Sequence, residues 1–167
     1  NTFEGSPPDK CPVCGAPKSA FVMLKEVVLP QRTVMDIIVE QLAAWGVKYV
    51  FGVPGRSNLA LIDSLRKQET VKFILTRHEG VAALMASATA KLTDNVGVCT
   101  AITGPGATNL INGLYDAKMD RAPVLALTGQ IAPQFIGYGA FQEIDLHALF
   151  EPVSIFNKSI ELSLIHI

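Results

Sequence analysis

Hydrophobic positions between residues 31 and 130 follow two alternating patterns, short apolar runs and longer amphipathic stretches. The short runs are rich in β-branched and aromatic residues and predict strands at 48–52, 71–75, 97–102 and 124–128. The longer stretches carry apolar residues three and four positions apart and predict helices after Thr33, after Ser57, at 77–91 and at 107–119. This alternation indicates an α/β fold, a parallel sheet with helices on both faces.

Residues with capping preferences mark the ends of the predicted helices. Thr33, with Asp36 three positions later, predicts a capped helix start, and Gly46 suits the left-handed position that ends a helix. Ser57 is expected to cap the second helix.

The predicted sheet also indicates where a ligand would lie. Ligands of parallel α/β sheets bind beyond the carboxyl ends of the strands. This rule brings four segments to one edge: 53–55, 77–79, 103–106 and 129–130. The apolar strands at 98–102 and 124–127 are expected in the sheet interior.

Composition and charge exclude several classes of protein. Of the 167 residues, 49% are hydrophobic and 17% charged, which is enough apolar material for a folded core. The net charge of −1 offers no basic surface for nucleic acid or anionic lipid. No apolar run approaches the roughly 18 residues of a membrane span.

Three cysteines are too few for a secreted disulfide framework, so we expect a cytoplasmic protein. The chain begins at Asn1 and stops abruptly, and we expect it to belong to a longer protein.

Two features at the predicted ligand edge each allow two interpretations. Glu79 lies where a strand ends and a helix begins, a place where the helix dipole alone favours a carboxylate. Its functional interpretation is a partly buried carboxyl that passes a proton to a ligand nitrogen. Gly104 and Gly106 resemble the start of a phosphate loop or, equally, form a tight turn that requires glycine. The next strand ends in Thr128, Gly129 and Gln130 without an acidic residue, which disfavours a nicotinamide site.

The cysteines suggest an incomplete metal site. Cys11 and Cys14 form a CxxC metal knuckle, but a tetrahedral iron or zinc site needs four ligands. Cys99 lies in an apolar strand and is expected in the core. Residues 7–21 resemble the second half of a rubredoxin, which implies iron only in a complete module. We therefore divide the chain into a partial rubredoxin-like segment and linker (1–30), a main domain (31–158) and a truncated tail (159–167).

Six motifs of the main domain occur in an order and spacing that together identify a family. They are GVPG at 52–55, TRHEG at 76–80, TGPGATN at 103–109, NGLYD at 112–116, PVLALTGQ at 123–130 and AFQE at 140–143. Together they resemble the pyrimidine-binding, amino-terminal domain of thiamine-diphosphate enzymes of the pyruvate oxidase and acetolactate synthase group.

The resemblance implies roles for individual residues. It makes Glu79 the glutamate that hydrogen-bonds N1′ of the aminopyrimidine ring, and it assigns Phe141 and Gln142 to the substrate side of the thiazolium. The positions implied at the cofactor are Val53, Pro54, Gly55, Glu79, Thr103, Gly104, Pro105, Gly106 and Asn109. The family holds the diphosphate through Mg²⁺ on a separate domain, whose Gly-Asp motif this chain lacks. A flavin (FAD) is a further cofactor of some members.

The resemblance therefore predicts one half of an enzyme that decarboxylates pyruvate or a similar 2-oxo acid. Pyruvate oxidation is the preferred reaction, because a rubredoxin-like iron carrier suits the removal of electrons. The alternatives are an acetolactate synthase-type carboligase, a non-catalytic assembly domain and a small metalloprotein built on the CxxC. The expected partner is the diphosphate-binding domain of another subunit in a homo-oligomer, a dimer or tetramer, and we expect the chain alone to be inactive.

Overall fold

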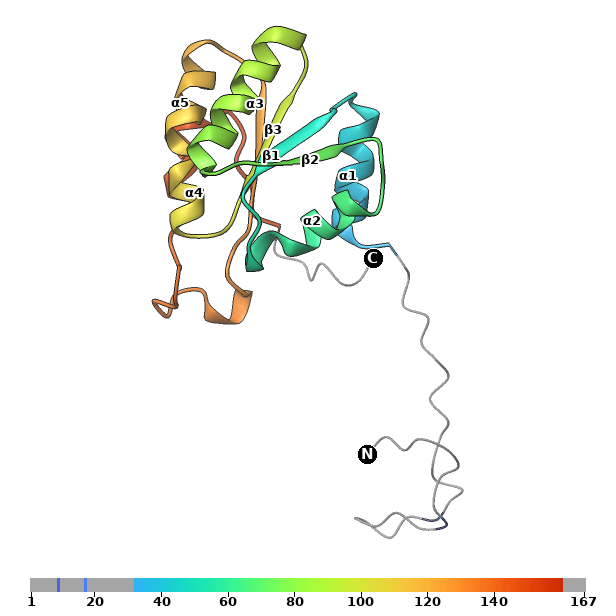
Figure 1. Cartoon of the computed structure of the whole chain (residues 1–167). Helices are drawn as coiled ribbons and strands as arrows, with labels where there is room; N and C mark the ends of the chain where they lie inside the picture. Colours follow the sequence, from blue (N-terminus) through green and yellow to red (C-terminus); the bar gives the residue numbers. More distant parts are fainter. Residues whose placement is uncertain (1–8, 10–16, 18–31, 161–167) are drawn as a thin grey trace. The chain divides into compact units, whose positions relative to one another are not determined.

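A parallel sheet of four strands forms the centre of the described structure. The computed structural model describes residues 9, 17 and 32–160, and from Arg32 onwards these belong to one compact unit (Figure 1). The strands are β1 (Tyr49–Gly52), β2 (Lys72–Leu75), β3 (Gly97–Ala101) and β4 (Val124–Thr128), in the order β2-β1-β3-β4. All neighbouring pairs are parallel, which confirms the predicted α/β fold. Cys11 and Cys14 lie outside the described residues, and so does most of the predicted rubredoxin-like segment.

Helices cover both faces of this sheet (Figure 1). They are α1 (Val34–Ala44), α2 (Leu59–Arg66), α3 (Glu79–Thr93), α4 (Pro105–Asn109), α5 (Ile111–Met119) and α6 (Leu146–Phe150). Short 3₁₀ turns, η2 (Arg56–Asn58), η3 (Pro133–Phe135) and η4 (Glu151–Val153), complete the connections. Within the described ranges no helix is both long and apolar enough to cross a membrane.

The sheet separates two hydrophobic cores, because successive side chains of a strand point to opposite faces. Val50 of β1 and Val98 of β3 pack with α1 and α2. Their neighbours Phe51 and Cys99 pack on the other face with α3, α5 and α6. Cys99 is completely buried, which raises its thiol pKa to about 12 and confirms the predicted core cysteine.

The first helix begins as its sequence predicts. The Thr33 hydroxyl accepts a hydrogen bond from the Asp36 amide at 3.2 Å, and the Thr33 amide donates to the Asp36 carboxylate at 2.7 Å. Ser64 of α2 donates to the same carboxylate at 2.6 Å and so ties α2 to α1. The bonds from Ser64 and Thr33 lower the pKa of Asp36. At the other end of the helix Gly46 has the predicted left-handed backbone, with φ of +80°.

Three local predictions are wrong in detail. Asn58, not Ser57, precedes α2, and the Ser57 side chain accepts a hydrogen bond from the Thr103 amide instead. The helix predicted at 107–119 begins at Pro105 and is divided at Leu110 into α4 and α5. Within the described sheet, β4 is an edge strand with half-buried residues and is not interior, because the strand order gives it β3 as its neighbour.

Candidate active site

Two of the predicted loop segments pack on one side chain, Ile102, which follows β3. A Cβ atom added to Gly55 would lie 2.4 Å from Ile102, and one added to Gly106 would lie 2.6 Å from it. The same atom on Gly106 would lie 3.2 Å from Oε1 of Glu79. The turn at 53–55 and the start of α4 therefore pack on the same side chain, and Glu79 lies against the start of α4, as the strand-end rule predicts.

Glu79 is the first residue of α3 and is half-buried. Its Oε2 accepts a hydrogen bond of 3.0 Å from the side-chain amide of Asn109, the last residue of α4. His78 caps the helix just before it, with Nδ1 accepting from the Gly80 amide at 3.1 Å. One carboxylate oxygen is thus oriented by a neutral amide, while the other lies over Gly106.

Asn58 shapes the turn at 53–55, and sequence analysis gave it no role. This side chain is 4% exposed. Its Oδ1 accepts from the Gly55 amide at 2.8 Å, and its Nδ2 donates to the Val53 carbonyl at 3.1 Å. Nδ2 also lies 3.4 Å from the Thr100 hydroxyl on β3. Asn58 therefore holds the turn against the sheet, a role that its position after a Gly-rich turn does not reveal.

Thr103 connects three further segments at the same edge. Its amide donates to the Ser57 hydroxyl at 3.0 Å, and its own hydroxyl lies 3.0 Å from Oε1 of Gln130. The same hydroxyl reaches the Gln142 carbonyl at 3.4 Å. The loops after β1, β3 and β4 are thereby linked through one buried residue.

The structure places Gln142 close to this network but leaves Phe141 in solvent. Gln142 has a left-handed backbone, with φ of +65°. It packs closely on Gly104, because a Cβ atom added to Gly104 would lie 2.6 Å from the carbonyl oxygen of Gln142. Phe141 is 88% exposed. Pro54 and Pro105 are also exposed, while Val53 is half-buried.

These residues suit an aminopyrimidine ring better than a diphosphate. A carboxylate can exchange a proton with a ring nitrogen, and the turn at 104–106 lies beside that of Glu79. The side chains of Glu79, Asn109 and the two turns are acidic or neutral, so they supply no cation for a phosphate group. Within the described residues no group of histidine, cysteine and acidic side chains could hold a metal ion.

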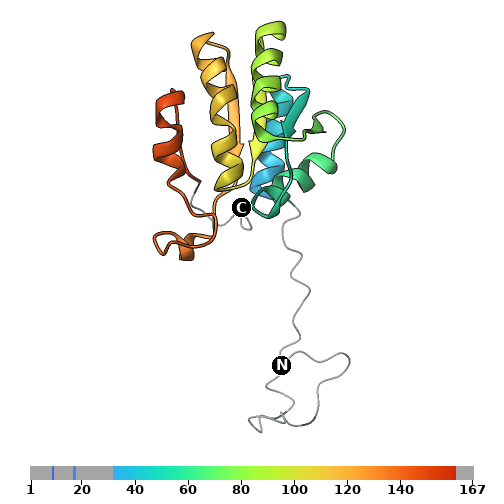
Figure 2. The ribbon, with the colours of Figure 1, turned by 60° about the vertical axis from the view of Figure 1, so that its left-hand side comes forward.

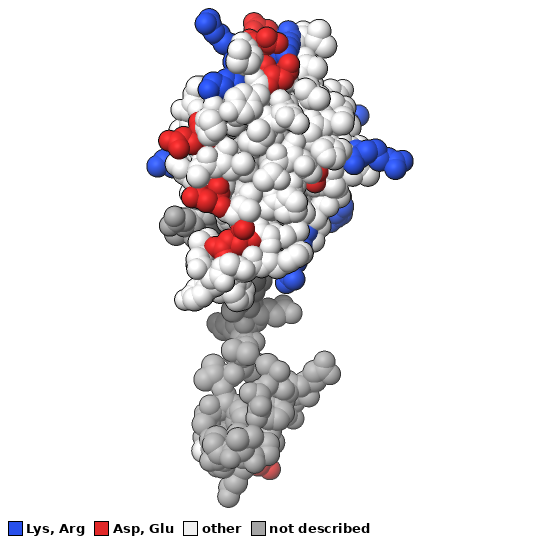
Figure 3. All heavy atoms as spheres, turned by 90° about the vertical axis from the view of Figure 1, so that its left-hand side faces the viewer, with Lys and Arg blue, Asp and Glu red and all other residues white. Residues whose placement is uncertain are grey.

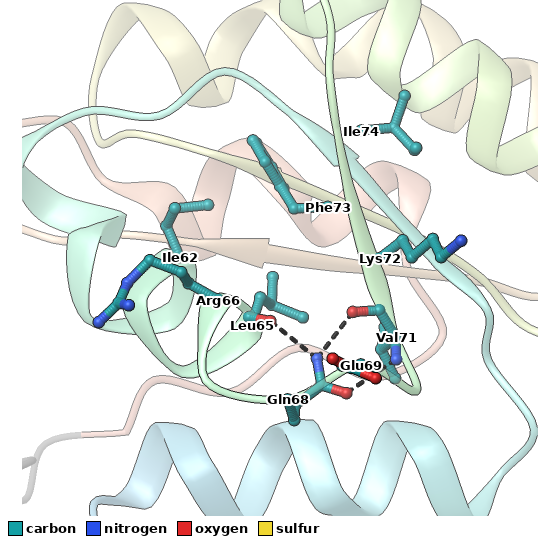
Figure 4. Close-up of a pocket in the computed structure, with 9 residues that line it drawn as sticks. All are labelled: Ile62, Leu65, Arg66, Gln68, Glu69, Val71, Lys72, Phe73 and Ile74. Carbon is teal, nitrogen blue, oxygen red and sulfur yellow. Dashed lines mark hydrogen bonds between the residues drawn. The ribbon is translucent and has the colours of Figure 1, made fainter.

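A separate hollow of about 820 Å³ lies between α2 and β2 (Figure 4). It is lined by Ile62, Leu65, Arg66, Gln68, Glu69, Val71, Lys72, Phe73 and Ile74. The Gln68 amide occupies its base by donating to the carbonyls of Leu65 and Val71. None of the residues predicted for the site lines this hollow, and the Gln68 amide is already bonded to the backbone.

A comparison with protein families matches residues 32–149 to the model described as thiamine pyrophosphate enzyme, N-terminal TPP binding domain. Thiamine pyrophosphate is another name for thiamine diphosphate. The chain belongs to this family. Its match includes the 53–55 turn, Glu79, the start of α4 and the 137–143 loop.

The curated relatives include proteins named as acetolactate synthase and as pyruvate oxidase, the two groups that the motifs resemble. The protein YdaP of Bacillus subtilis (strain 168) is 50% identical over 133 residues, which are 79% of this chain and 23% of YdaP. An acetolactate synthase large subunit of Pyropia yezoensis is 41% identical over 133 residues, 78% of this chain and 22% of that protein. A pyruvate oxidase of Lactiplantibacillus plantarum is 41% identical over 121 residues, 72% of this chain and 20% of that enzyme. This chain therefore spans about a fifth of the length of these relatives.

Proposed function

We propose that this chain supplies the pyrimidine-binding half of an enzyme that decarboxylates pyruvate or a similar 2-oxo acid with thiamine diphosphate. The proximity of Glu79, Asn109 and the two glycine turns carries the proposal. When bound, the cofactor supplies a thiazolium carbon that adds to the keto group and takes up the electrons left by decarboxylation.

Glu79 holds and moves the proton in this proposal. Because Oε2 accepts from Asn109, Oε1 over Gly106 is the oxygen that would donate a proton to N1′ of the aminopyrimidine. The backbone at 53–55, fixed by Asn58, would pack against the ring. Gln142, on the loop that docks at Gly104, would face the substrate together with Phe141.

The diphosphate and its Mg²⁺ would be held by another subunit, since the site residues carry no cation. Exposed apolar side chains support such a partner: Val81 and Leu84 lie on α3, the helix that begins at Glu79, and Tyr115 and Met119 lie on the neighbouring α5. Figure 3 shows that the face on this side of the molecule carries few charged side chains over its middle. Apolar surface of this kind is typical of an interface, and we propose a homo-oligomer.

Oxidation of pyruvate is the preferred reaction, and acetolactate synthesis is the alternative. The preference depends on the sequence of residues 7–21, which resembles part of a one-electron iron carrier. Relatives of comparable identity have names of both kinds, an acetolactate synthase and a pyruvate oxidase.

A chimera tests the proposed function directly. The 121 matched residues of the Lactiplantibacillus plantarum pyruvate oxidase are replaced by the corresponding residues of this chain, and pyruvate-dependent reduction of an artificial acceptor is measured. We expect an active chimera that loses about 100-fold or more of its activity in Glu79→Gln, since acid–base catalysis contributes about 10²–10⁴-fold. Glu69→Gln is the matched control, because Glu69 is exposed and lines the separate hollow.

Two outcomes would contradict the proposal. Activity of the folded Glu79→Gln chimera within a few-fold of its parent would favour a non-catalytic assembly domain. For the 167-residue chain alone we expect weak binding of thiamine diphosphate by calorimetry and no decarboxylation. Tight, Mg²⁺-dependent binding to this chain would contradict the requirement for a second subunit.

A further inference from the structure

Glu143 makes an unusual set of contacts with the loop that precedes it. Between β4 and α6 the chain projects from the carboxyl end of the sheet (Figure 2). There the Glu143 carboxylate accepts two backbone hydrogen bonds, one from Gly137 through Oε1 and one from Ala140 through Oε2 at 2.9 Å. The Glu143 amide in turn donates to the Ala140 carbonyl at 2.9 Å. One residue therefore holds both ends of the turn at 137–140.

The turn has few other contacts that define its shape. Gly137 and Gly139 have left-handed backbones, with φ of +92° and +68°. A Cβ atom added to either would meet nothing within 4 Å, so these glycines serve the backbone conformation and not close packing. Between them Tyr138 is 83% exposed. The Tyr138 amide donates to the Phe135 carbonyl at 3.4 Å, and beyond this bond the conformation of the turn depends on its glycines and on Glu143.

The neighbouring residue anchors the same segment to the sheet. Gln142 packs its left-handed backbone on Gly104 and accepts from the Thr103 hydroxyl at 3.4 Å. A non-glycine residue in this conformation is strained and persists only where its surroundings impose it. Glu143 fixes the turn that precedes Phe141, and the contact with Gly104 fixes the backbone of Gln142.

We propose that Glu143 is a positioning residue that folds the 137–140 turn and thereby presents Phe141 and Gln142 to the 2-oxo acid. This inference rests on the proposed function, in which these two side chains face the substrate. In this role Glu143 acts through the turn, because each of its carboxylate oxygens accepts a hydrogen bond from a backbone amide.

Charge is part of this role. An ionised carboxylate accepts at both oxygens, whereas a glutamine keeps only one acceptor and turns a donor toward the second amide. Hydrogen bonds from the Gly137 and Ala140 amides lower the pKa of Glu143. Tyr138 is the one titratable side chain within the turn, and Thr103 and Gly104, which pack against the segment, have none.

Nuclear magnetic resonance of the 167-residue chain tests the contact itself. In the unsubstituted chain the amide signals of Gly137 and Ala140 should shift together with pH, with a midpoint below the ordinary glutamate value of 4.5. Glu143→Gln should raise the hydrogen-exchange rate of these two amides about tenfold or more, and Glu143→Asp should raise it less. Glu151→Gln, at an exposed glutamate in η4, is the matched control. Unchanged exchange in Glu143→Gln would overturn the proposal.

Kinetics of the chimera test the consequence. Glu143→Gln should raise the KM for pyruvate about tenfold, while the Kd for thiamine diphosphate stays within twofold of the parent. Glu143→Asp, which keeps the carboxylate, should raise the KM for pyruvate less than Glu143→Gln does. An active parent with unchanged KM in Glu143→Gln would overturn the positioning role alone. An inactive, folded parent chimera would overturn the proposed function and this role with it.

Discussion

The hydrogen bond from Asn109 to Glu79 is the most direct test of how the site is built. Asn109→Ala removes the amide that orients Oε2 at 3.0 Å and replaces it with a methyl group that cannot donate. The carboxylate can then turn toward solvent, since Glu79 is only half-buried. We expect both a less stable domain and a less active enzyme.

The size of the effect follows from the kind of bond. Hydrogen bonds to charged groups contribute about 1.5–3 kcal/mol, and the lower value applies here because water can replace the lost donor. A loss of about 1.5 kcal/mol corresponds to about a tenfold fall in kcat/KM. The free energy of unfolding of the isolated chain should fall by the same amount, about 1.5 kcal/mol, because the bond joins α4 to the start of α3.

The assay compares Asn109→Ala with Asn112→Ala. Asn112 lies one turn further along, on α5, and its side chain is exposed, so the control makes the same chemical change without touching Glu79. Urea unfolding of the chain and kcat/KM of the chimera are measured for both variants. If Asn109→Ala matches Asn112→Ala in both measurements, the bond does not orient the carboxylate and our description of the site is wrong.

Two further predictions concern the packing of the domain and its pH dependence. Gly113→Ala should lower the free energy of unfolding in urea by about 1–3 kcal/mol, despite better helix propensity, because the new Cβ would lie 2.5 Å from that of Ala83 on α3; equal or greater stability would contradict this packing. Asp36→Asn should cost stability above the ordinary aspartate pKa of 3.8, and the difference from the parent should vanish as pH falls through the lowered folded pKa. A difference that persists in acid would argue against an ionised Asp36.

Local signals were sufficient for much of the fold. Thr33 and Gly46 act through their own backbone neighbourhood, so capping preferences predicted both ends of α1 correctly. Ser57 has the same local preference, but its partner is the Thr103 amide, 46 residues away. A capping rule considers only neighbours in sequence, whereas the Thr103 amide reaches the Ser57 hydroxyl only in the folded protein. The edge position of β4 likewise depends on strand order, which apolar composition does not encode.

The site was predictable where it depends on topology and not where it depends on paired side chains. The rule that ligands lie at strand ends brought Glu79 and the 104–106 segment together, as the structure has them. The bond between Asn109 and Glu79 joins residues 30 positions apart, and nothing in either motif indicates it. Glu143 is adjacent to Gln142 in sequence, yet its contact with Gly137 arises from two left-handed glycines.

The separation of the two cores by the sheet has a practical consequence for protein engineering. The core under α1 and α2 contains Val39, Leu42 and Leu65, and none of the residues assigned to catalysis belongs to it. Substitutions in well-separated regions usually add in their effect on stability. Stabilising changes introduced beneath α1 and α2 should therefore compensate for costly alterations around Glu79, so that the catalytic face can be redesigned on a reinforced scaffold.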